Sequence, residues 1–220
     1  MDYIFNVFLK LLSGLKVTLI IFSVTIIFSI PLGLLIAFLR NLKIKLLTKL
    51  IDIFTWFIRG TPLLLQLYFM VYGIRIIFNN LTGVSLNIDD LKIACITFVI
   101  NYTAYFVEIF RGGINSISKG QFESAYILGL SKYHTYTKII LPQTFKKTIP
   151  SITNEAINLI KDTSLVSAVA IFDILNTTKR IVSLDFRFDA YFLAAILYLL
   201  LTYIVVLIFK KLEKKYSYYN

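Results

Sequence analysis

Long apolar runs alternate with shorter polar segments along the whole chain. A helix needs about 20 apolar residues to cross a bilayer. Runs near that length lie at about 17–39, 53–78, 91–110, 152–172 and 190–209. Lipid cannot satisfy the backbone of an open strand, and the short alternating segments typical of a membrane barrel do not occur. The pattern therefore predicts an all-α integral membrane protein of five transmembrane helices, with residues 1–220 forming one domain.

The five runs differ in the charges that they carry. The first and fifth contain no charged residue, whereas the middle three contain Arg59, Glu108, Lys161 and Asp162. An ionisable group within a span costs about 2.5–3.5 kcal/mol on insertion scales and usually faces a cavity or a partner. The middle three runs are therefore expected to form an inner layer, and the outer two to face lipid. Alternatively, these charges lie near the interface and extend toward water, which suits Arg59 better than the short Asp162.

Composition supports the membrane class and changes the meaning of the charge. The chain is 58% hydrophobic with a mean hydropathy of +0.78, whereas soluble domains are about 45–50% apolar. The net charge of +11 could indicate nucleic-acid binding. The basic residues instead cluster at the ends of apolar runs, as membrane topology requires, so no nucleic-acid partner is expected. One cysteine, Cys95, and one histidine, His134, lie far apart and form neither a disulfide nor a metal site.

Lysine and arginine are distributed unequally between the two sides that five spans would create. Such an excess marks the cytoplasmic side. It places the N-terminus outside, the C-terminus in the cytoplasm, and the polar segment 119–150 in the cytoplasm. The richer side holds Arg40, Lys43, Lys45, Lys49, Arg111, Lys119, Lys132, Lys138, Lys146, Lys147, Lys210, Lys211, Lys214 and Lys215, and the poorer side Lys10, Lys16, Lys92, Lys179, Arg180 and Arg187.

The polar segment has the pattern of a compact helix–turn–helix over about 119–143. A first helix is expected at 121–130, with small residues at Ser124 and Ala125 that let another surface approach closely. Gly129 supplies a turn that a larger residue would resist. A second helix is expected to end at Pro142. The alternative is an amphipathic helix that rests on lipid headgroups.

The spacing within this segment resembles the EAA loop of permease subunits in bacterial ABC importers. Glu123, Ala125 and Gly129 are followed by Ile139 and then Leu141-Pro142, with Ser124 where the family usually has alanine. The resemblance implies that the loop sits in a groove on a separate ATPase subunit. Its implied coupling positions are Glu123, Ala125 and Gly129.

The energy source is expected to come from that partner. No phosphate-binding loop of the G-x-x-x-x-G-K-[ST] type occurs in the chain. The chain is therefore expected to carry no cofactor and no catalytic residues of its own, and ATP would be bound and hydrolysed by the ATPase subunit.

Other stretches narrow the resemblance to the polar amino-acid permeases, the histidine, glutamine, arginine and cystine-type uptake systems. They are RGTPLLLQ at 59–66, EIFRGGI at 108–114 and KDTSL at 161–165, and the similarity covers about residues 10–210. The resemblance implies a multi-pass protein of the bacterial cytoplasmic membrane that imports a polar amino acid by alternating access. It also implies a second permease subunit, identical or homologous, and an extracytoplasmic binding protein that meets the outer segments at about 79–90 and 173–189.

An amino acid is a zwitterion, so its pathway needs an acid for the ammonium and donors for the carboxylate. Asp162 and Glu108 are the acidic candidates, and the sequence leaves open which of them faces the pathway. Gly60 and Thr61, which precede a proline, suggest an interrupted helix with free backbone groups, and Ser164 adds a hydroxyl. The alternative role for all five is interhelical hydrogen bonding. Four residues of the third run have the same two possible roles: Asn101, Tyr102, Thr103 and Tyr105.

Two other classes of protein compete with this interpretation. An ion- or proton-coupled secondary amino-acid transporter would work without an ATPase, but usually shows many more spans and internal repeats. A membrane-embedded enzyme would need a converging catalytic set, and Asp162 and Ser164 have no histidine near them in the spans.

Overall fold

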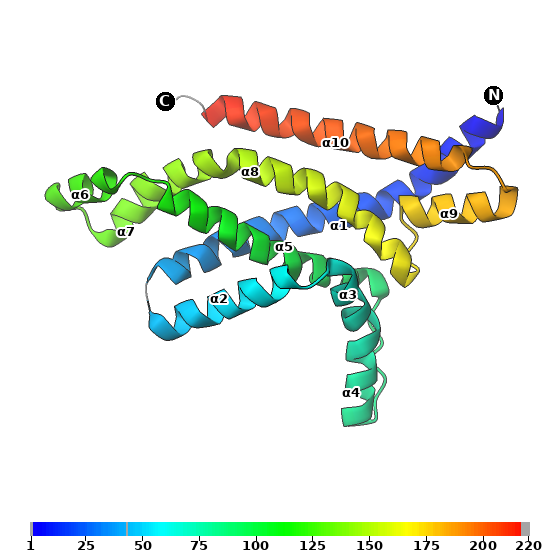
Figure 1. The fold of residues 1–220 in the computed structure, drawn as a ribbon, viewed down its shortest axis with the longest axis horizontal. Helices are drawn as coiled ribbons and strands as arrows, with labels where there is room; N and C mark the ends of the chain where they lie inside the picture. Colours follow the sequence, from blue (N-terminus) through cyan, green and yellow to red (C-terminus); the bar gives the residue numbers. More distant parts are fainter. Residues whose placement is uncertain (1, 43, 217–220) are drawn as a thin grey trace.

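The structure is a computed structural model that describes residues 2–42 and 44–216, and its elements over these residues are helical. Four long helices, α1, α5, α8 and α10, run along the long axis of the molecule (Figure 1). The short helices α6 and α7 lie at one end, and α9 lies at the other. The α-helices are α1 (Asp2–Asn41), α2 (Lys45–Gly60), α3 (Leu63–Tyr68), α4 (Ile74–Thr82), α5 (Asp90–Asn115), α6 (Lys119–Ile127), α7 (Lys132–His134), α8 (Leu141–Asp162), α9 (Ile174–Asp185) and α10 (Asp189–Tyr216).

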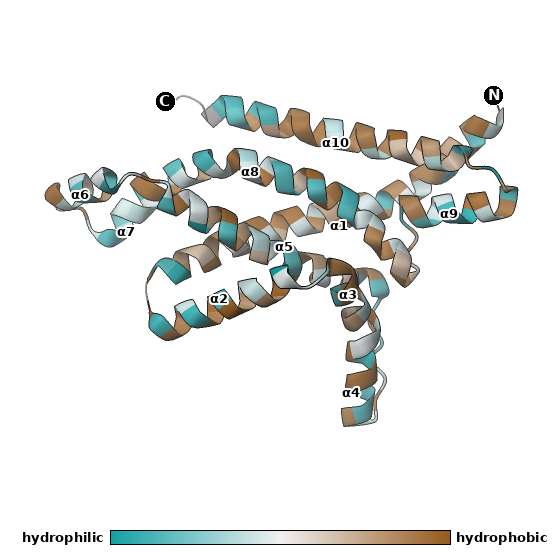
Figure 2. Ribbon diagram, in the orientation of Figure 1, coloured by the Kyte–Doolittle hydropathy of each residue, from teal (hydrophilic) through white to brown (hydrophobic). Residues whose placement is uncertain are grey.

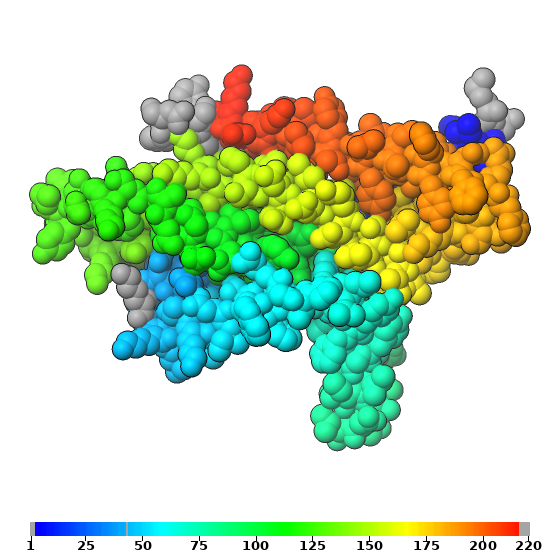
Figure 3. Space-filling model, in the orientation of Figure 1, coloured from blue at the N-terminus to red at the C-terminus, as the bar shows by residue number. Residues whose placement is uncertain are grey.

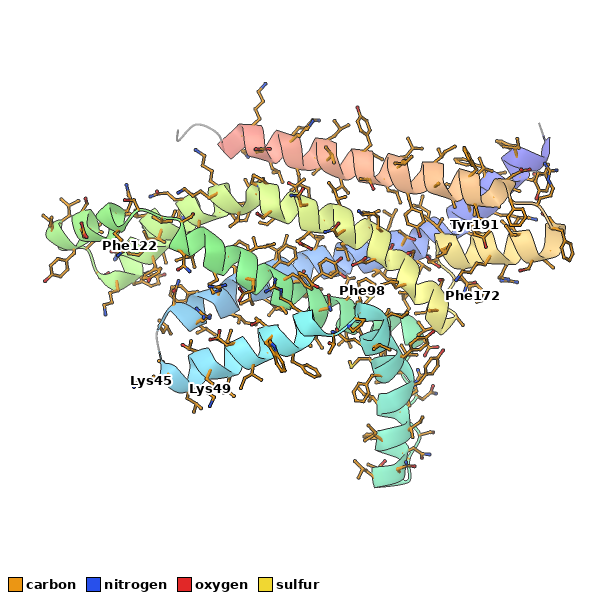
Figure 4. All side chains as sticks on the ribbon, viewed as in Figure 1. Lys45, Lys49, Phe98, Phe122, Phe172 and Tyr191 are labelled. Carbon is orange, nitrogen blue, oxygen red and sulfur yellow. The ribbon has the colours of Figure 1, made fainter. Side chains whose placement is uncertain are left out.

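Helix α5 forms the centre of the bundle and packs against α1, α2 and α8. Of its most apolar window, 67% of residues are buried, compared with 22% for α1 and 17% for α10. Figure 4 shows Phe98 of α5 in the interior of the bundle, where its side chain is fully buried. Gly33 lets α1 lie close against α5, because it has no side chain: a Cβ at this position would come within 2.5 Å of the Phe106 Cβ. The third apolar run is therefore central, whereas the Leu63–Thr82 part of the second run, which was predicted to share the inner layer, has 11% of its most apolar window buried.

The hydropathy of the long helices agrees with this arrangement. Figure 2 shows α1 and α10 as mostly hydrophobic, whereas α8 alternates between polar and apolar residues. Helix α8 carries buried residues such as Ile152, Ala156 and Leu159 on the side that packs against its neighbours. The charge-free runs 17–39 and 190–209 within α1 and α10 thus present wide apolar surfaces to the outside, and α8, which carries charges along its length, lies beside the core.

The second apolar run, at about 53–78, is not one helix, and it is interrupted where the sequence suggested, at Gly60 and Thr61. Helix α2 ends at Gly60, and Thr61 is extended with φ −115° and ψ 142°. Pro62 explains the break, because it lacks an amide hydrogen and disfavours helical geometry in the residue before it. Beyond it, α3, the π-helical turn η1 (Phe69–Gly73) and α4 form an arm. This arm turns away from the bundle axis (Figure 1) and stands out as a separate lobe (Figure 3).

The fourth run also differs from the helix predicted at 152–172. Helix α8 ends at Asp162 and continues as the 3₁₀ turn η3 (Thr163–Val169). Hydroxyl groups support the tighter turn: Thr163 Oγ1 donates to the carbonyl of Ile160 at 2.7 Å, and Ser164 Oγ donates to that of Lys161 at 2.7 Å. Side chains of this kind compete with regular helical hydrogen bonds. The change of helix type therefore falls at the KDTSL sequence.

The polar segment folds as α6, a tight turn and a second, much longer helical stretch. Gly129 has φ +69°, and the turn closes with bonds from Leu130 N to Ala125 O and from Gly129 N to Tyr126 O, both 3.0 Å. This is the glycine turn that the sequence predicted. The second helix does not end at Pro142, because α7 and the π-helical turn η2 (Thr135–Ile140) lead directly into α8. The wider π turn directly before Pro142 accommodates a proline within the helical path.

Candidate functional site

A cavity of about 410 Å³ lies where α3, α5 and α8 meet. This volume lies within the range of small-molecule sites, about 300–1,000 Å³. Most of the side chains that line the cavity are polar or charged, which is unusual within a largely apolar bundle. They are Leu63, Asn101, Tyr102, Tyr105, Glu155, Asn158, Lys161 and Asp162.

The α5 wall is formed by Asn101, Tyr102 and Tyr105. The hydroxyl of Tyr102 donates to Asp162 Oδ2 at 2.7 Å, and Asn101 Nδ2 donates to Gln66 Oε1 at 3.0 Å. These residues therefore line the cavity and also join helices, so the two roles that the sequence left open coexist. Thr103 faces elsewhere: it is 3% exposed and does not line the cavity.

The α8 wall carries the charges. Glu155, Asn158 and Asp162 are spaced by three and four residues, which places them on one face of the helix. Lys161 lies at the edge of this face. The sequence analysis identified Asp162 but missed Glu155 and Asn158. Their helical spacing from Asp162 was the signal that could have found them.

The interruption between α2 and α3 is held by Gln66. Its Nε2 donates to the carbonyl of Ile58 at 2.8 Å and to Thr61 Oγ1 at 2.7 Å. Because α2 ends here, the Ile58 carbonyl lacks its helical partner. Gly60 and Thr61 do not line the cavity. They form the break between α2 and α3. Gln66 bonds to Thr61 at this break and also accepts a hydrogen bond from Asn101, which lines the cavity.

Glu108 has basic partners and does not line the cavity. It pairs closely with Arg111 one turn later on α5 and lies 3.8 Å from Arg59 Nη1 on α2. The Arg59 guanidinium also lies over the Tyr105 ring, 5.3 Å from its centroid. Ser164 is likewise outside the cavity and bonds to its own helix. Of the five residues predicted for the pathway, Asp162 alone lines this cavity.

A second surface of interest is the tip of α6. Glu123 is exposed there, and it borders a shallow hollow together with Phe122, Tyr126 and Ile127. The apolar side chains at the tip have little cover: Tyr126 is 85% exposed and Ile127 is 82% exposed. Ala125 is 1% exposed. Its small size therefore serves packing within this chain, not the approach of another surface as predicted.

The chain matches the family model of the "Binding-protein-dependent transport system inner membrane component" over residues 29–218. This chain belongs to that family. The probable amino-acid permease protein YxeN of Bacillus subtilis is 31% identical and aligns with 98% of this chain and 95% of its own length. The glutamine transport system permease protein GlnP of Escherichia coli is 32% identical, with 93% of this chain and 92% of its own length covered.

Solved structures of ABC transporters share the fold. A crystal structure described as an amino acid ABC transporter with histidines superposes with a TM-score of 0.82 and 29% identity, over 94% of both chains. The MetNI methionine ABC transporter gives 0.77 at 16% identity, over 94% of this chain and 96% of that chain, which shows the fold alone. The family assignment confirms the ABC permease resemblance and the multi-pass inner-membrane location. It supports the importer interpretation over the secondary-transporter alternative.

Proposed function

We propose that this permease is the translocation subunit of an ATP-driven importer for a polar amino acid, and that the α3–α5–α8 cavity is part of the amino-acid pathway. The cavity carries this proposal, because acids, a lysine and amides converge in it beside two breaks in regular helix. Interrupted helices within transporters often mark binding sites. Relatives named for glutamine and cystine transport support the substrate class.

Asp162 is the acid best placed for a substrate ammonium. It lines the cavity, and it accepts a hydrogen bond from the neutral hydroxyl of Tyr102 on α5. Lys161 and the two asparagines offer donors for a carboxylate. Glu108 contributes indirectly, since its pairing with Arg59 joins α2 to α5 next to Tyr105.

The proposal includes five membrane-crossing helices: α1, α2, α5, α8 and α10. Helices α2 and α8 run along α1 and α5 (Figure 1), and 16 and 22 residues correspond to about 24 and 33 Å of helix. By length and composition the arm at Leu63–Thr82 qualifies as a span, whereas α2 and α8 do not. We assign the arm to the outer membrane surface, because it turns away from the axis along which α1, α5, α8 and α10 run (Figure 1).

The orientation has the N-terminus outside and the C-terminus in the cytoplasm. Lys45 and Lys49 at the start of α2 lie at the same end of the molecule as Phe122 of α6 (Figure 4). The basic C-terminal part of α10 ends on that side as well (Figure 1). Excess positive charge marks the cytoplasmic face, which supports a cytoplasmic position for the α6 tip.

The α6 tip is proposed to dock on an ABC ATPase subunit that binds ATP. Exposed Glu123 and the apolar side chains beside it form the contact, and Gly129 sets the turn that supports the tip. A second permease copy or homologue completes the pathway, and an extracytoplasmic binding protein delivers substrate at the α9 end. Closure of the ATPase pair would then rock the two permeases between outward- and inward-facing states.

Purification of the tagged chain from its native membrane in mild detergent tests this function. An ATPase subunit is expected to co-purify at near one-to-one ratio, and proteoliposomes of the complex are expected to take up a polar amino acid only with ATP. The Glu123→Lys variant should lose the ATPase subunit. The Asp162→Asn variant should retain it and lose uptake. A chain that purifies alone and transports nothing would refute the proposal.

A further inference from the structure

The outer face of α10 carries an apolar stripe that ends in lysines. Leu200, Ile204 and Leu207 are 50%, 52% and 41% exposed, and their spacing of four and three residues places them on one side of the helix. Lys211 and Lys214 follow at the same spacing, and both are exposed. One continuous row of side chains therefore changes from apolar to basic between Leu207 and Lys211.

The lysines lie opposite the side of α10 that packs on the bundle. Val205 marks that packing side, since it is buried in a cluster with Ala156 and Ile160 of α8. At 3.6 residues per turn, the four lysines near the end of α10 share an arc of about 140°, centred nearly opposite Val205. These lysines are Lys210, Lys211, Lys214 and Lys215. The basic groups therefore point away from the protein and continue its outward apolar surface.

The positive charge of this face is not balanced within the segment. Glu213 is the single acid among residues 210–215, where it stands beside four lysines. Among the described residues, no salt bridge joins Lys210, Lys211 or Lys215 to an acid. The end of α10 thus offers a cluster of positive charge to an anion from outside the chain.

The cluster begins where α10 leaves the hydrocarbon. Residues 190–209 contain no charge, and 20 helical residues correspond to about 30 Å, the thickness of the hydrocarbon core of a bilayer. Figure 2 shows this change, because the hydrophobic helix becomes hydrophilic toward its C-terminal end. Clusters of lysine directly after a membrane span attract anionic lipids. Lys210 and Lys211 therefore lie at the level of the lipid headgroups.

The outward face of α10 is also distant from the proposed pathway. Helix α10 packs on α8, and α8 packs in turn on α5 (Figure 1). The cavity lies where α3, α5 and α8 meet. A second permease placed at that cavity would therefore approach from the other side of α8, which leaves the outward face of α10 to lipid.

We propose that α10 binds an anionic phospholipid, such as phosphatidylglycerol. The phosphate lies against Lys211 and Lys214, and an acyl chain follows Leu207 and Ile204 along the same face. The proposal goes beyond the transport function and does not depend on it. The proposed orientation adds only the leaflet, which is the cytoplasmic one.

Native mass spectrometry of the purified full-length chain in detergent tests the proposal. The chain is titrated with phosphatidylglycerol and with phosphatidylcholine of the same acyl chains, a pair that differs in net charge. The tightest-bound phosphatidylglycerol is expected to bind at least tenfold more tightly than phosphatidylcholine. Lys211→Gln/Lys214→Gln should abolish this preference, because each lysine near the surface contributes roughly fivefold to anionic-lipid binding. Lys211→Arg/Lys214→Arg, which keeps the charge, should retain it.

Lys132→Gln/Lys138→Gln is the matched control. Both lysines are exposed and lie in α7 and η2, so the net charge changes equally at a place away from α10. This variant should keep the lipid preference, and size-exclusion profiles should show that all variants remain monodisperse. An equal concentration of inorganic phosphate should not displace the lipid, since phosphate has no acyl chain for the apolar stripe.

Three results would overturn the proposal. The first is equal binding of the two lipids to the unaltered chain, which needs no variant to interpret. The second is an equal loss of preference in the α10 variant and in its control, which would indicate a diffuse effect of net charge. The third is displacement by inorganic phosphate, which would indicate an ordinary anion site. None of these measurements involves an ATPase or an amino acid, so their failure would leave the proposed transport function untouched.

Discussion

The hydroxyl of Tyr102 donates a hydrogen bond of 2.7 Å to Oδ2 of Asp162, which joins the middle of α5 to the C-terminal end of α8. Tyr102 is 2% exposed, and its ring lies beside those of Phe98 and Phe106. The phenol is therefore held by packing, and it fixes in turn the carboxylate that faces the cavity. The bond orients a group of the proposed pathway and also ties two helices together.

Tyr102→Phe removes this bond and keeps the ring. A hydrogen bond to a charged group contributes about 1.5–3 kcal/mol, and the Asp162 carboxylate would lose its fixed direction. We expect weaker substrate binding and a lower midpoint of thermal unfolding in detergent. Binding assays and thermal scans of the variant would check this. Tyr203→Phe is the control, since Tyr203 is 59% exposed on α10 and should tolerate the change. Equal behaviour of the two variants would contradict the role given to Tyr102.

Gly129→Ala tests the turn behind the α6 tip. A Cβ at Gly129 would meet no atom within 4 Å, so the cost comes from φ +69° alone. A left-handed conformation costs a non-glycine residue about 1–2 kcal/mol. We expect poorer association with the ATPase subunit and lower coupled ATPase activity, with substrate binding at the cavity retained.

Gly83→Ala is a closely matched control for that variant. Gly83 also has φ +69° and open space around its Cβ position, but it ends α4 on the arm. The two substitutions therefore carry the same backbone strain at different places. Gly83→Ala should leave ATPase association unchanged, and a loss of association as large as in Gly129→Ala would argue against a docking role for the α6 tip.

The apolar pattern predicted the class of fold because lipid permits few alternatives for a spanning segment. It did not locate the helix ends at Gly60 and Asp162 by itself, since hydropathy continues across both positions. Pro62 was a usable local signal, and the interruption at Gly60 and Thr61 was predicted from it. Pro142 was a misleading one, because the π turn before it lets the helix continue.

The site was predicted less completely than the fold. Asp162 was identified by its depth in an apolar run, but Glu155 was overlooked although it lies on the same face of α8, seven residues before Asp162. Glu108 was identified by the same reasoning and proved to be paired with Arg111 and Arg59. Sequence shows which ionisable groups lie within spans. Only the packing of α2, α5 and α8 shows which of them are already neutralised.

Gln66→Leu tests the connection between the helix break and the cavity. The leucine would leave the Ile58 carbonyl and the Thr61 hydroxyl without their donor, and Asn101 without the acceptor for its amide. A buried polar group without a partner costs about 1–3 kcal/mol. We expect a lower midpoint of thermal unfolding together with reduced substrate affinity, because Asn101 lines the cavity.

Gln143→Leu provides the comparison for Gln66→Leu. Gln143 makes one exposed side-chain bond of 3.2 Å, to Gln121, far from the cavity. The same chemical change there should leave both the unfolding midpoint and substrate affinity close to those of the unaltered chain. If Gln66→Leu lowered stability but not affinity, the break would serve only to shape the fold. If it lowered both, the break between α2 and α3 would be part of the machinery that positions the substrate.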